Sequence, residues 1–306
     1  MPNVEQSGGD VRIARAGDLE IAYETFGEPA APPLVLIMGL ATQMLGWPDG
    51  FCAALAERGH YVIRFDNRDI GLSTHLSDAP PVDVTGLLGG DMSSAAYTLS
   101  DMARDTVGLL DALGIESAHL VGASMGGTIA QTLAIEHPER VRSLTSMMST
   151  TGDPEVGQPT REALGAVLAP RPKDREGAID RVVANYRIIG SPGYEVDEAA
   201  LRERAALAYD RSNDPEGVLR QLAAVWASGD RTERLRELDV PTLVLHGRED
   251  PLATLSGGTA TAEAIPGSNL VVFDGMGHDL PRPLWPEIID RISSLVSRAE
   301  GARVGR

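Results

Sequence analysis

The chain has 306 residues, of which 42% are hydrophobic, and a net charge of −17, which suits one large globular domain with an inserted subdomain. Most of the excess acid lies in residues 1–150, so we expect neither nucleic acid nor an anionic membrane as a partner. Cys52 is the single cysteine, which excludes an internal disulfide.

The N-terminal residues lack the basic and apolar segments of a signal peptide. An apolar run at 34–41 is the longest in the sequence and is far too short to span a bilayer. We therefore expect a soluble cytoplasmic protein that is a monomer or a homodimer.

Residues 1–150 alternate predicted strands with predicted helices. Alternating or continuous apolar residues predict strands at 11–15, 19–25, 34–38, 61–65, 119–121 and 141–148. Apolar residues at helical spacing predict helices at 51–58, from 100 or 101 to 113, and from Ser124 to 137. Residues 74–97, rich in Pro, Gly, Ser and Asp, are predicted to be irregular. This order indicates a mostly parallel sheet with helices on both faces.

The pattern changes in residues 151–235, which contain no apolar run typical of a buried strand. Helical stretches broken by prolines are predicted there, at 161–169, 178–189, 197–209 and 216–227. We interpret this part as an inserted helical cap. The α/β pattern resumes in residues 236–306, with strands at 241–246 and 269–273, helices at 256–264 and 284–298, and a frayed end at 299–306. Residues 1–150 and 236–306 thus form the predicted core.

A possible nucleophile lies between a strand and a helix, in the sequence Gly122-x-Ser124-x-Gly126. This spacing is typical of a nucleophile elbow, a strained turn that exposes the serine hydroxyl at the top of a sheet. The glycines allow close backbone approach, and the following helix offers its positive end to a developing anion. A chance match remains the alternative, because Gly, Ala and Ser are common in this sequence. The surrounding residues must therefore decide.

A nucleophilic serine needs a base and an acid that orients the base. His278 follows the strand at 269–273 in a glycine-rich loop, which makes it the preferred base. Asp250 follows the strand at 241–246 and is our preferred acid, with Glu249 and Asp153 as alternatives. The remaining histidines begin or end strands, end a helix or lie in the irregular segment: His60, His75, His119, His137 and His246.

Two backbone N–H groups are needed to stabilise an oxyanion. Met125 should supply one, because it directly follows the serine, and Leu40 the other, with Gly39 allowing the loop to turn. Gly39 is also a candidate for substrate binding. Aromatic residues could line a pocket between the core and the cap, although each could equally be core or cap packing: Trp47, Tyr97, Tyr186, Tyr209 and Trp226. The charged turn 66–69 is interpreted as structural, through Asx turns and arginine pairing.

Several segments in order carry a family resemblance: Leu36-Ile-Met-Gly-Leu40, Gly46-Trp-Pro48, Asp66-Asn-Arg-Asp69-x-Gly-x-Ser73, Val121-Gly-Ala-Ser-Met-Gly-Gly127, His246-Gly-x-x-Asp250 and Gly275-Met-Gly-His278. Over residues 10–295 the chain resembles bacterial α/β-hydrolases, and more narrowly aclacinomycin methylesterase-like carboxylesterases and lipases. The resemblance implies an eight-stranded, mostly parallel sheet. It also implies a Ser124–Asp250–His278 triad with Leu40 and Met125 as oxyanion donors. Met38 replaces the histidine usual in the wider superfamily, as it does in the methylesterase-like group.

These observations predict an enzyme that cleaves small-molecule carboxylic esters through an acyl-enzyme. A thioesterase, a C–C hydrolase and a cofactor-free haloperoxidase remain alternatives on the same triad, and a non-catalytic small-molecule receptor is a further one. Serine at the elbow, in place of aspartate, disfavours dehalogenase and epoxide-hydrolase chemistry. No phosphate-binding loop and no metal-ligand spacing occurs in the sequence, so we expect no cofactor and no metal.

Overall fold

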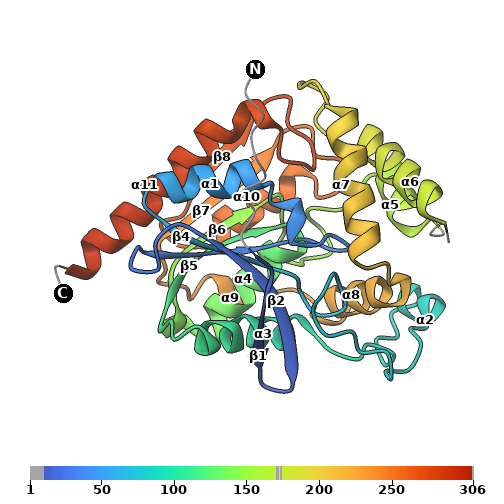
Figure 1. Ribbon diagram of the computed structural model, residues 1–306, viewed down its shortest axis with the longest axis horizontal. Coiled ribbons are helices and arrows are strands. Elements are labelled where there is room, and N and C mark those ends of the chain that lie inside the picture. Colours follow the sequence, from blue (N-terminus) through green and yellow to red (C-terminus); the bar gives the residue numbers. More distant parts are fainter. Residues whose placement is uncertain (1–9, 170–171, 173, 305–306) are drawn as a thin grey trace.

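The computed structural model describes residues 10–169, 172 and 174–304. In this part of the chain, eight strands form one sheet in the order β1-β2-β4-β3-β5-β6-β7-β8 (Figure 1). The pairs β1–β2 and β2–β4 are antiparallel, and all others are parallel, which confirms the predicted sheet. The strands are β1 (Arg12–Ala16), β2 (Leu19–Phe26), β3 (Pro33–Ile37), β4 (Tyr61–Phe65), β5 (Ala118–Ala123), β6 (Val141–Met147), β7 (Thr242–Gly247) and β8 (Asn269–Phe273).

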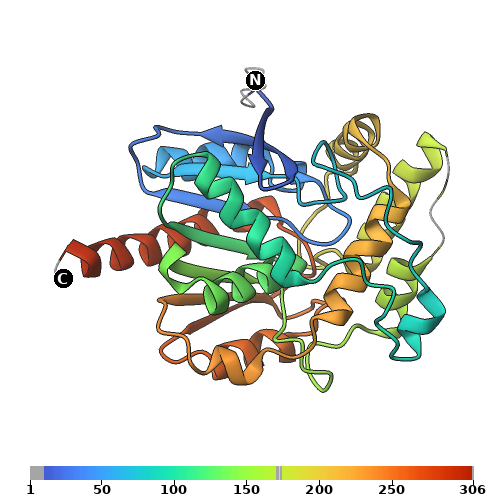
Figure 2. The ribbon, with the colours of Figure 1, turned by 90° about the horizontal axis from the view of Figure 1, so that it is seen from below.

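Helices cover both faces of the sheet (Figures 1 and 2). Side chains of neighbouring strand residues point to opposite faces, so Val62 and Ile63 of β4 belong to two different apolar clusters. The Val62 cluster packs against α1 (Asp49–Glu57) and α11 (Trp285–Val304). The Ile63 cluster packs against the helices α3 (Leu99–Ala112), α4 (Met125–Glu136), α9 (Thr232–Leu235) and α10 (Leu255–Ala264). Short 3-10 helices occupy Met44–Gly46, Pro138–Arg140 and Arg282–Leu284.

Four further helices follow β6 and lie together on the right of Figure 1: α5 (Arg161–Leu168), α6 (Arg175–Ile189), α7 (Glu198–Arg211) and α8 (Pro215–Ala227). Each is preceded by an N-cap residue whose side chain accepts a hydrogen bond from the first turn, which satisfies an otherwise unpaired N–H group. These residues are Thr160, Asp174, Asp197 and Asp214. The helices fall within the segment predicted as a cap, and the division of the chain into core and cap stays a prediction.

Two predictions of local structure were wrong. A short helix, α2 (Val84–Leu88), lies within the segment predicted to be irregular, because the Asp83 carboxylate accepts a hydrogen bond from the Gly86 N–H and caps it. Residues 299–304 continue α11 and are not frayed. Ala299 is buried there, and the Glu300 carboxylate contacts His119 and Arg142. Residues 305–306 of the predicted frayed end lie outside the described residues.

None of the helices in the described ranges combines the length and the apolar character needed to cross a bilayer.

Candidate active site

Ser124 lies on the turn between β5 and α4, in a conformation with φ 55° and ψ −121°. Its N–H donates to the Met147 carbonyl of the neighbouring strand at 2.9 Å, which anchors the turn to the sheet. A Cβ atom at Gly126 would lie 2.0 Å from the Ile37 carbonyl oxygen, so only glycine fits there. Ser124 is half-buried and lies directly before the first residue of α4, where the backbone N–H groups of the first turn have no partner within the helix.

Asp250 and His278 come together although 28 residues separate them. The His278 Nδ1 atom lies 2.7 Å from the Asp250 Oδ2 atom. The other carboxylate oxygen accepts the N–H groups of Leu252 and Ala253 at 2.8 and 2.9 Å, and the Asp250 side chain is fully buried. Three contacts thus orient the Asp250 carboxylate. Because the Asp250 carboxylate accepts a hydrogen bond from the His278 Nδ1–H, the neutral ring carries its proton on Nδ1, and its Nε2 atom is free to accept another. Within the described residues, no hydrogen bond joins His278 to Ser124.

The alternative acids lie elsewhere. The Glu249 carboxylate is exposed and accepts from the Gly275 N–H at 2.7 Å. The Asp153 carboxylate accepts from the Glu155 N–H at 2.8 Å, within its own turn. Of these three carboxylates, only that of Asp250 contacts His278 in the structure.

His246 lies behind the Asp250 carboxylate. Its Nε2 atom is 2.6 Å from the Ala253 carbonyl oxygen and 3.7 Å from Asp250 Oδ2. Burial lowers the pKa of this imidazole, so a neutral ring donates to Ala253 and helps to fix the turn that carries Asp250. The other nitrogen of the ring is buried and has no hydrogen-bond partner among the described residues.

Of the two predicted oxyanion donors, Met125 directly follows Ser124 in the chain and Leu40 directly follows Gly39. Neither the Leu40 N–H nor the Met125 N–H makes a hydrogen bond within the described residues. Gly39 lies directly against the serine, since a Cβ atom on Gly39 would be 3.0 Å from Ser124 Cβ. The loop after β3 and the first turn of α4 therefore offer unpaired N–H groups close to Ser124, and the role of Leu40 and Met125 as oxyanion donors stays a prediction.

Tyr186 of α6 lies beside the histidine loop. Burial, followed by the charge of Asp279, raises the pKa of the Tyr186 hydroxyl. Asp279 also accepts a hydrogen bond from the Ser191 hydroxyl. The backbone N–H of His278 donates to the Ile189 carbonyl at 2.7 Å. The end of α6 is thus bound directly to the loop that carries His278. No sequence pattern had singled out Ser191 or Asp279, because their contacts join distant segments.

The two tryptophans predicted for the pocket lie in different surroundings. Trp47 is 1% exposed and stacks on Phe51, with ring centroids 5.8 Å apart, in the core cluster beneath α1. Trp226 lies half-buried on α8. Their roles in substrate binding stay predictions. A cleft of about 350 Å³ does lie near the acid loop, lined by residues 186–188, 190–192, 194 and 196 together with Glu249 and Pro251.

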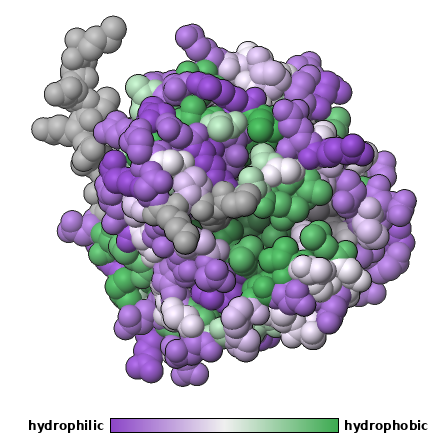
Figure 3. Space-filling model, turned by 90° about the vertical axis from the view of Figure 1, so that its right-hand side faces the viewer, coloured by the Kyte–Doolittle hydropathy of each residue, from purple (hydrophilic) through white to green (hydrophobic). Residues whose placement is uncertain are grey.

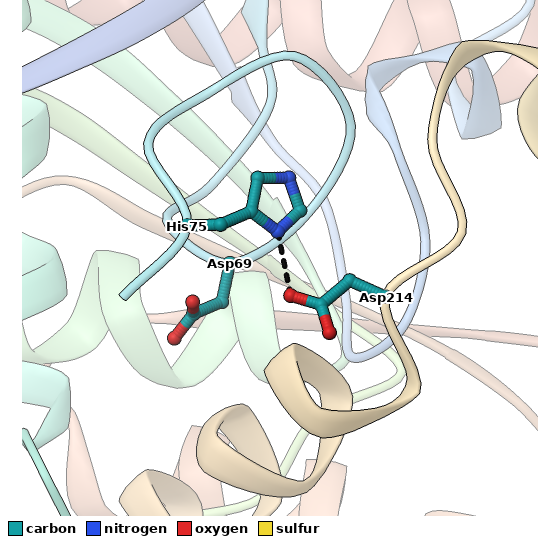
Figure 4. A group of neighbouring side chains, drawn as sticks. All are labelled: Asp69, His75 and Asp214. Atoms are coloured by element: carbon teal, nitrogen blue, oxygen red, sulfur yellow. Dashed lines mark hydrogen bonds and ion pairs between the residues drawn. The ribbon is translucent and has the colours of Figure 1, made fainter. Parts of the chain in front are cut away.

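Asp69, His75 and Asp214 bring their ligand atoms within 4.8 Å of one another, which is close enough to consider a metal ion (Figure 4). The Arg220 guanidinium already occupies this cluster, however, with hydrogen bonds of 2.9 and 2.8 Å to the two Asp69 oxygens and one of 3.3 Å to Asp214. The positive charge that these carboxylates need is therefore supplied by arginine. The geometry favours a structural ion-pair cluster over a metal site.

Cys52 offers no alternative nucleophile. It is a fully buried residue of α1, and burial raises the pKa of its thiol to about 12. Only the thiolate is a strong nucleophile, so this cysteine is inert at neutral pH.

Comparison with known families decides the classification. A family described as alpha/beta hydrolase fold matches residues 32–187, and one described as TAP-like protein matches residues 218–283. The chain belongs to the alpha/beta hydrolase fold family. The family resemblance found in the sequence is thereby confirmed.

Relatives within the alpha/beta hydrolase family include hydrolases of different bonds. Rhodomycin D methylesterase DauP from Streptomyces sp. (strain C5) is 29% identical, over 88% of this chain and 92% of its own length. A 2-hydroxymuconate semialdehyde hydrolase from Pseudomonas sp. (strain CF600) is 34% identical over 67% of this chain and 69% of its own. Among solved structures, the esterase RhEst1 from Rhodococcus sp. ECU1013 superposes with a TM-score of 0.70, at 28% identity over 93% of this chain and 99% of that one.

Proposed function

We propose that this chain hydrolyses carboxylic esters of small molecules, with Ser124 as nucleophile, His278 as general base and acid, and Asp250 as the residue that orients the imidazole. The observation that carries the proposal is the buried Asp250–His278 pair, formed at the same end of the sheet as a serine in an elbow conformation. The methylesterase and esterase among the relatives favour an ester as the bond that is cleaved.

The proposed reaction proceeds in two halves. His278 Nε2 takes the hydroxyl proton as Ser124 Oγ attacks the ester carbonyl, and the N–H groups of Leu40 and Met125 hold the oxyanion. The tetrahedral intermediate then collapses, and His278 returns the proton to the leaving alcohol. A water molecule, deprotonated by the same imidazole, releases the acid and restores the serine. We expect the hydrogen bond between Ser124 and His278 to form when substrate binds, as catalytic hydrogen bonds often tighten in the complex.

The surface near the cap helices supports an apolar substrate. Figure 3 shows an apolar area within an otherwise hydrophilic face, on the side where α5–α7 lie. Large exposed apolar side chains come from α2, α5, α6 and α7, and they are Leu88, Leu164, Val182 and Leu207. We infer that the cap helices line the approach to Ser124. Because residues 151–235 contain no strongly apolar run, we expect small or aromatic esters to be favoured over emulsified lipid. Interfacial activation by long-chain triglyceride would contradict this inference.

A fluorophosphonate probe tests the nucleophile. We expect a single adduct on Ser124, and a fall in kcat of at least about 10³-fold on an aryl or methyl ester in Ser124→Ala. Asp250→Asn should lower kcat by up to about 10⁴-fold, because the amide favours the wrong imidazole tautomer. The matched control is Asp153→Asn, which should retain activity because Asp153 does not contact His278. Full esterase activity in Ser124→Ala would refute the proposal.

A C–C hydrolase is the second candidate, favoured by the identity with the 2-hydroxymuconate semialdehyde hydrolase. Turnover of a 2-hydroxy-6-oxo-dienoate faster than of any ester would support it. The same panel should contain an acyl thioester and a peracid assay for halide oxidation, because these reactions can use the same three residues. Tight ligand binding without an acyl-enzyme burst would instead indicate a receptor.

A further inference from the structure

The loop of residues 38–42 follows β3. Side chains from other segments make hydrogen bonds to its backbone both before and after Leu40. The side-chain amide of Asn67 donates to the Met38 carbonyl at 2.9 Å. The side-chain oxygen of Gln221, on α8, accepts from the Ala41 N–H at 3.1 Å. The proposed oxyanion donor Leu40 therefore lies in a segment that two amide side chains fix, one of them from a cap helix.

The backbone of this loop needs such support. Ala41 has a φ of 61°, in the left-handed region that costs a non-glycine residue about 1–2 kcal/mol. Such a conformation persists only where surrounding contacts determine it. Relaxation of Ala41 would move the adjacent Leu40, and with it Gly39, which lies against Ser124.

Gln221 is well placed to supply this support. It is fully buried, and its side-chain NH₂ group donates to the Arg68 carbonyl at 2.8 Å. The amide orientation is unambiguous, because the reverse orientation would place two donors, the NH₂ group and the Ala41 N–H, against each other. Arg68 is itself fixed, by two hydrogen bonds of 2.6 Å to Asp105 and by the Tyr97 ring 4.8 Å away.

The neighbouring residue fixes α8 on the same side. Arg220 makes two hydrogen bonds to the buried Asp69 carboxylate, in the segment that follows β4. Gln221 thus stands on a part of α8 that a buried ion pair ties to the core. We propose that Gln221 is a positioning residue for the oxyanion hole, which holds the Leu40 N–H in place through Ala41; this inference rests on the proposed ester hydrolysis.

The variant Gln221→Met tests this role, because it keeps the side-chain volume and removes both hydrogen bonds. We expect kcat on an aryl ester to fall about 10- to 100-fold with KM changed less than about threefold, since only transition-state stabilisation is lost. Affinity for a trifluoromethyl ketone, whose adduct with the serine carries an oxyanion, should fall in parallel. Gln221→Glu keeps an oxygen that accepts from the Ala41 N–H, so its loss of kcat should be smaller.

The matched control is Gln131→Met. Gln131 is also fully buried, donates to the Ser146 hydroxyl at 3.1 Å, and makes no hydrogen bond to residues 38–42 among those described. Its kcat should stay within about threefold of wild type at temperatures where circular dichroism shows every variant folded. Equal kcat and ketone affinity in the two methionine variants would overturn the inference. If Gln221→Met does not fold, Gln221→Leu takes its place, because leucine also removes both hydrogen bonds. Values of kcat and ketone affinity equal to those of Gln131→Met would then refute the role.

Failure of the hydrolysis and failure of the positioning role give different results. An active Ser124→Ala would reject the proposed hydrolysis as a whole. An inactive Ser124→Ala together with a Gln221→Met variant that matches the Gln131→Met control would reject only the positioning role of Gln221.

Discussion

Ser124 occupies a backbone conformation that costs about 1–3 kcal/mol in a residue other than glycine. Hydrogen bonds to both of its backbone groups hold it there. The N–H donates to Met147, and the carbonyl accepts from the Ser149 hydroxyl at 2.9 Å. Strand β6 and the residues that follow it thus stabilise the backbone conformation of Ser124. This conformation lets the half-buried hydroxyl project from the end of the sheet.

The close approach at Gly126 gives a stability prediction. A methyl group in Gly126→Ala would lie 2.0 Å from the Ile37 backbone oxygen, which cannot move without displacing β3. We expect a loss of about 1–3 kcal/mol in the free energy of unfolding, together with a loss of esterase activity. Urea denaturation measures the first quantity.

Gly165→Ala is the control for this substitution. Gly165 is exposed inside α5, and a methyl group there would meet no atom within 4 Å beyond the backbone of its own helix. Alanine should therefore raise the unfolding free energy by about 0.5–1 kcal/mol. Similar changes in unfolding free energy for Gly126→Ala and Gly165→Ala would show that the close approach of the Ile37 backbone does not constrain the turn at Ser124.

Among the helices of the predicted cap, α8 and the end of α7 are tied to the core by buried charges, α7 through the Arg211–Asp66 pair at 3.0 Å. Arg220 pairs with Asp69 in a fully buried contact, and His75 lies 2.7 Å from Asp214 at the start of α8 (Figure 4). The α6–α7 pair is joined instead by exposed ion pairs such as those of Arg202, which contribute little in water. We therefore expect α8 to remain attached to the core during motions of α5 and α6.

The His75–Asp214 pair should make stability depend on pH. Burial lowers the pKa of His75, but hydrogen bonds to Gly71 and Asp214 outweigh this and raise it overall. Burial raises the pKa of Asp214, but the Gly217 N–H and His75 outweigh this and lower it overall. The contribution of His75 is therefore fully present below its unfolded pKa of about 6.5 and is lost as the pH rises through the higher folded value.

Urea denaturation of His75→Gln at several pH values measures this dependence. The variant should be destabilised more at pH 5.5 than at pH 9, and at the lower pH Asp214 is still ionised, because its folded pKa lies below the ordinary value. His137→Gln is the control, since His137 is 3.9 Å from the exposed Glu139. A constant difference between His75→Gln and wild type across this range would contradict the assignment.

On the scale of the whole molecule, a net charge of −17 sets the long-range electrostatics. Arginines and carboxylates form many exposed pairs, yet carboxylates remain in excess, and the face in Figure 3 is mainly hydrophilic around its apolar area. Like-charge repulsion therefore opposes approach to anionic surfaces.

Vesicle binding tests this consequence. In low salt, the chain should not co-sediment with phosphatidylglycerol vesicles, and it should not retard a DNA duplex. Repulsion is screened within about 10 Å at 0.1 M salt, so any weak contact through the apolar area should appear with phosphatidylcholine or at higher salt. Binding to phosphatidylglycerol that weakens as salt is added would contradict the prediction.

Local patterns in the sequence were enough to predict the sheet and to select the candidate catalytic residues. Continuous apolar runs indicate buried parallel strands, because such strands are covered on both faces. Ser124, Asp250 and His278 were found because each follows such a strand, and parallel strands end at the same edge of a sheet. Capping by Asp83 and docking of the last turns of α11 escaped prediction, since both depend on a few specific contacts.

The sequence by itself determined the order of strands and helices, the family, and which residues could act as nucleophile, acid and base. Only the tertiary structure showed that Asp250, and neither Glu249 nor Asp153, contacts His278. It alone revealed Gln221, whose partner Ala41 lies 180 residues away in the chain. The physical reason is the range of the forces involved. Periodicity and turn chemistry act over a few residues, whereas the partner of a buried amide or carboxylate is chosen by the packing of the whole chain.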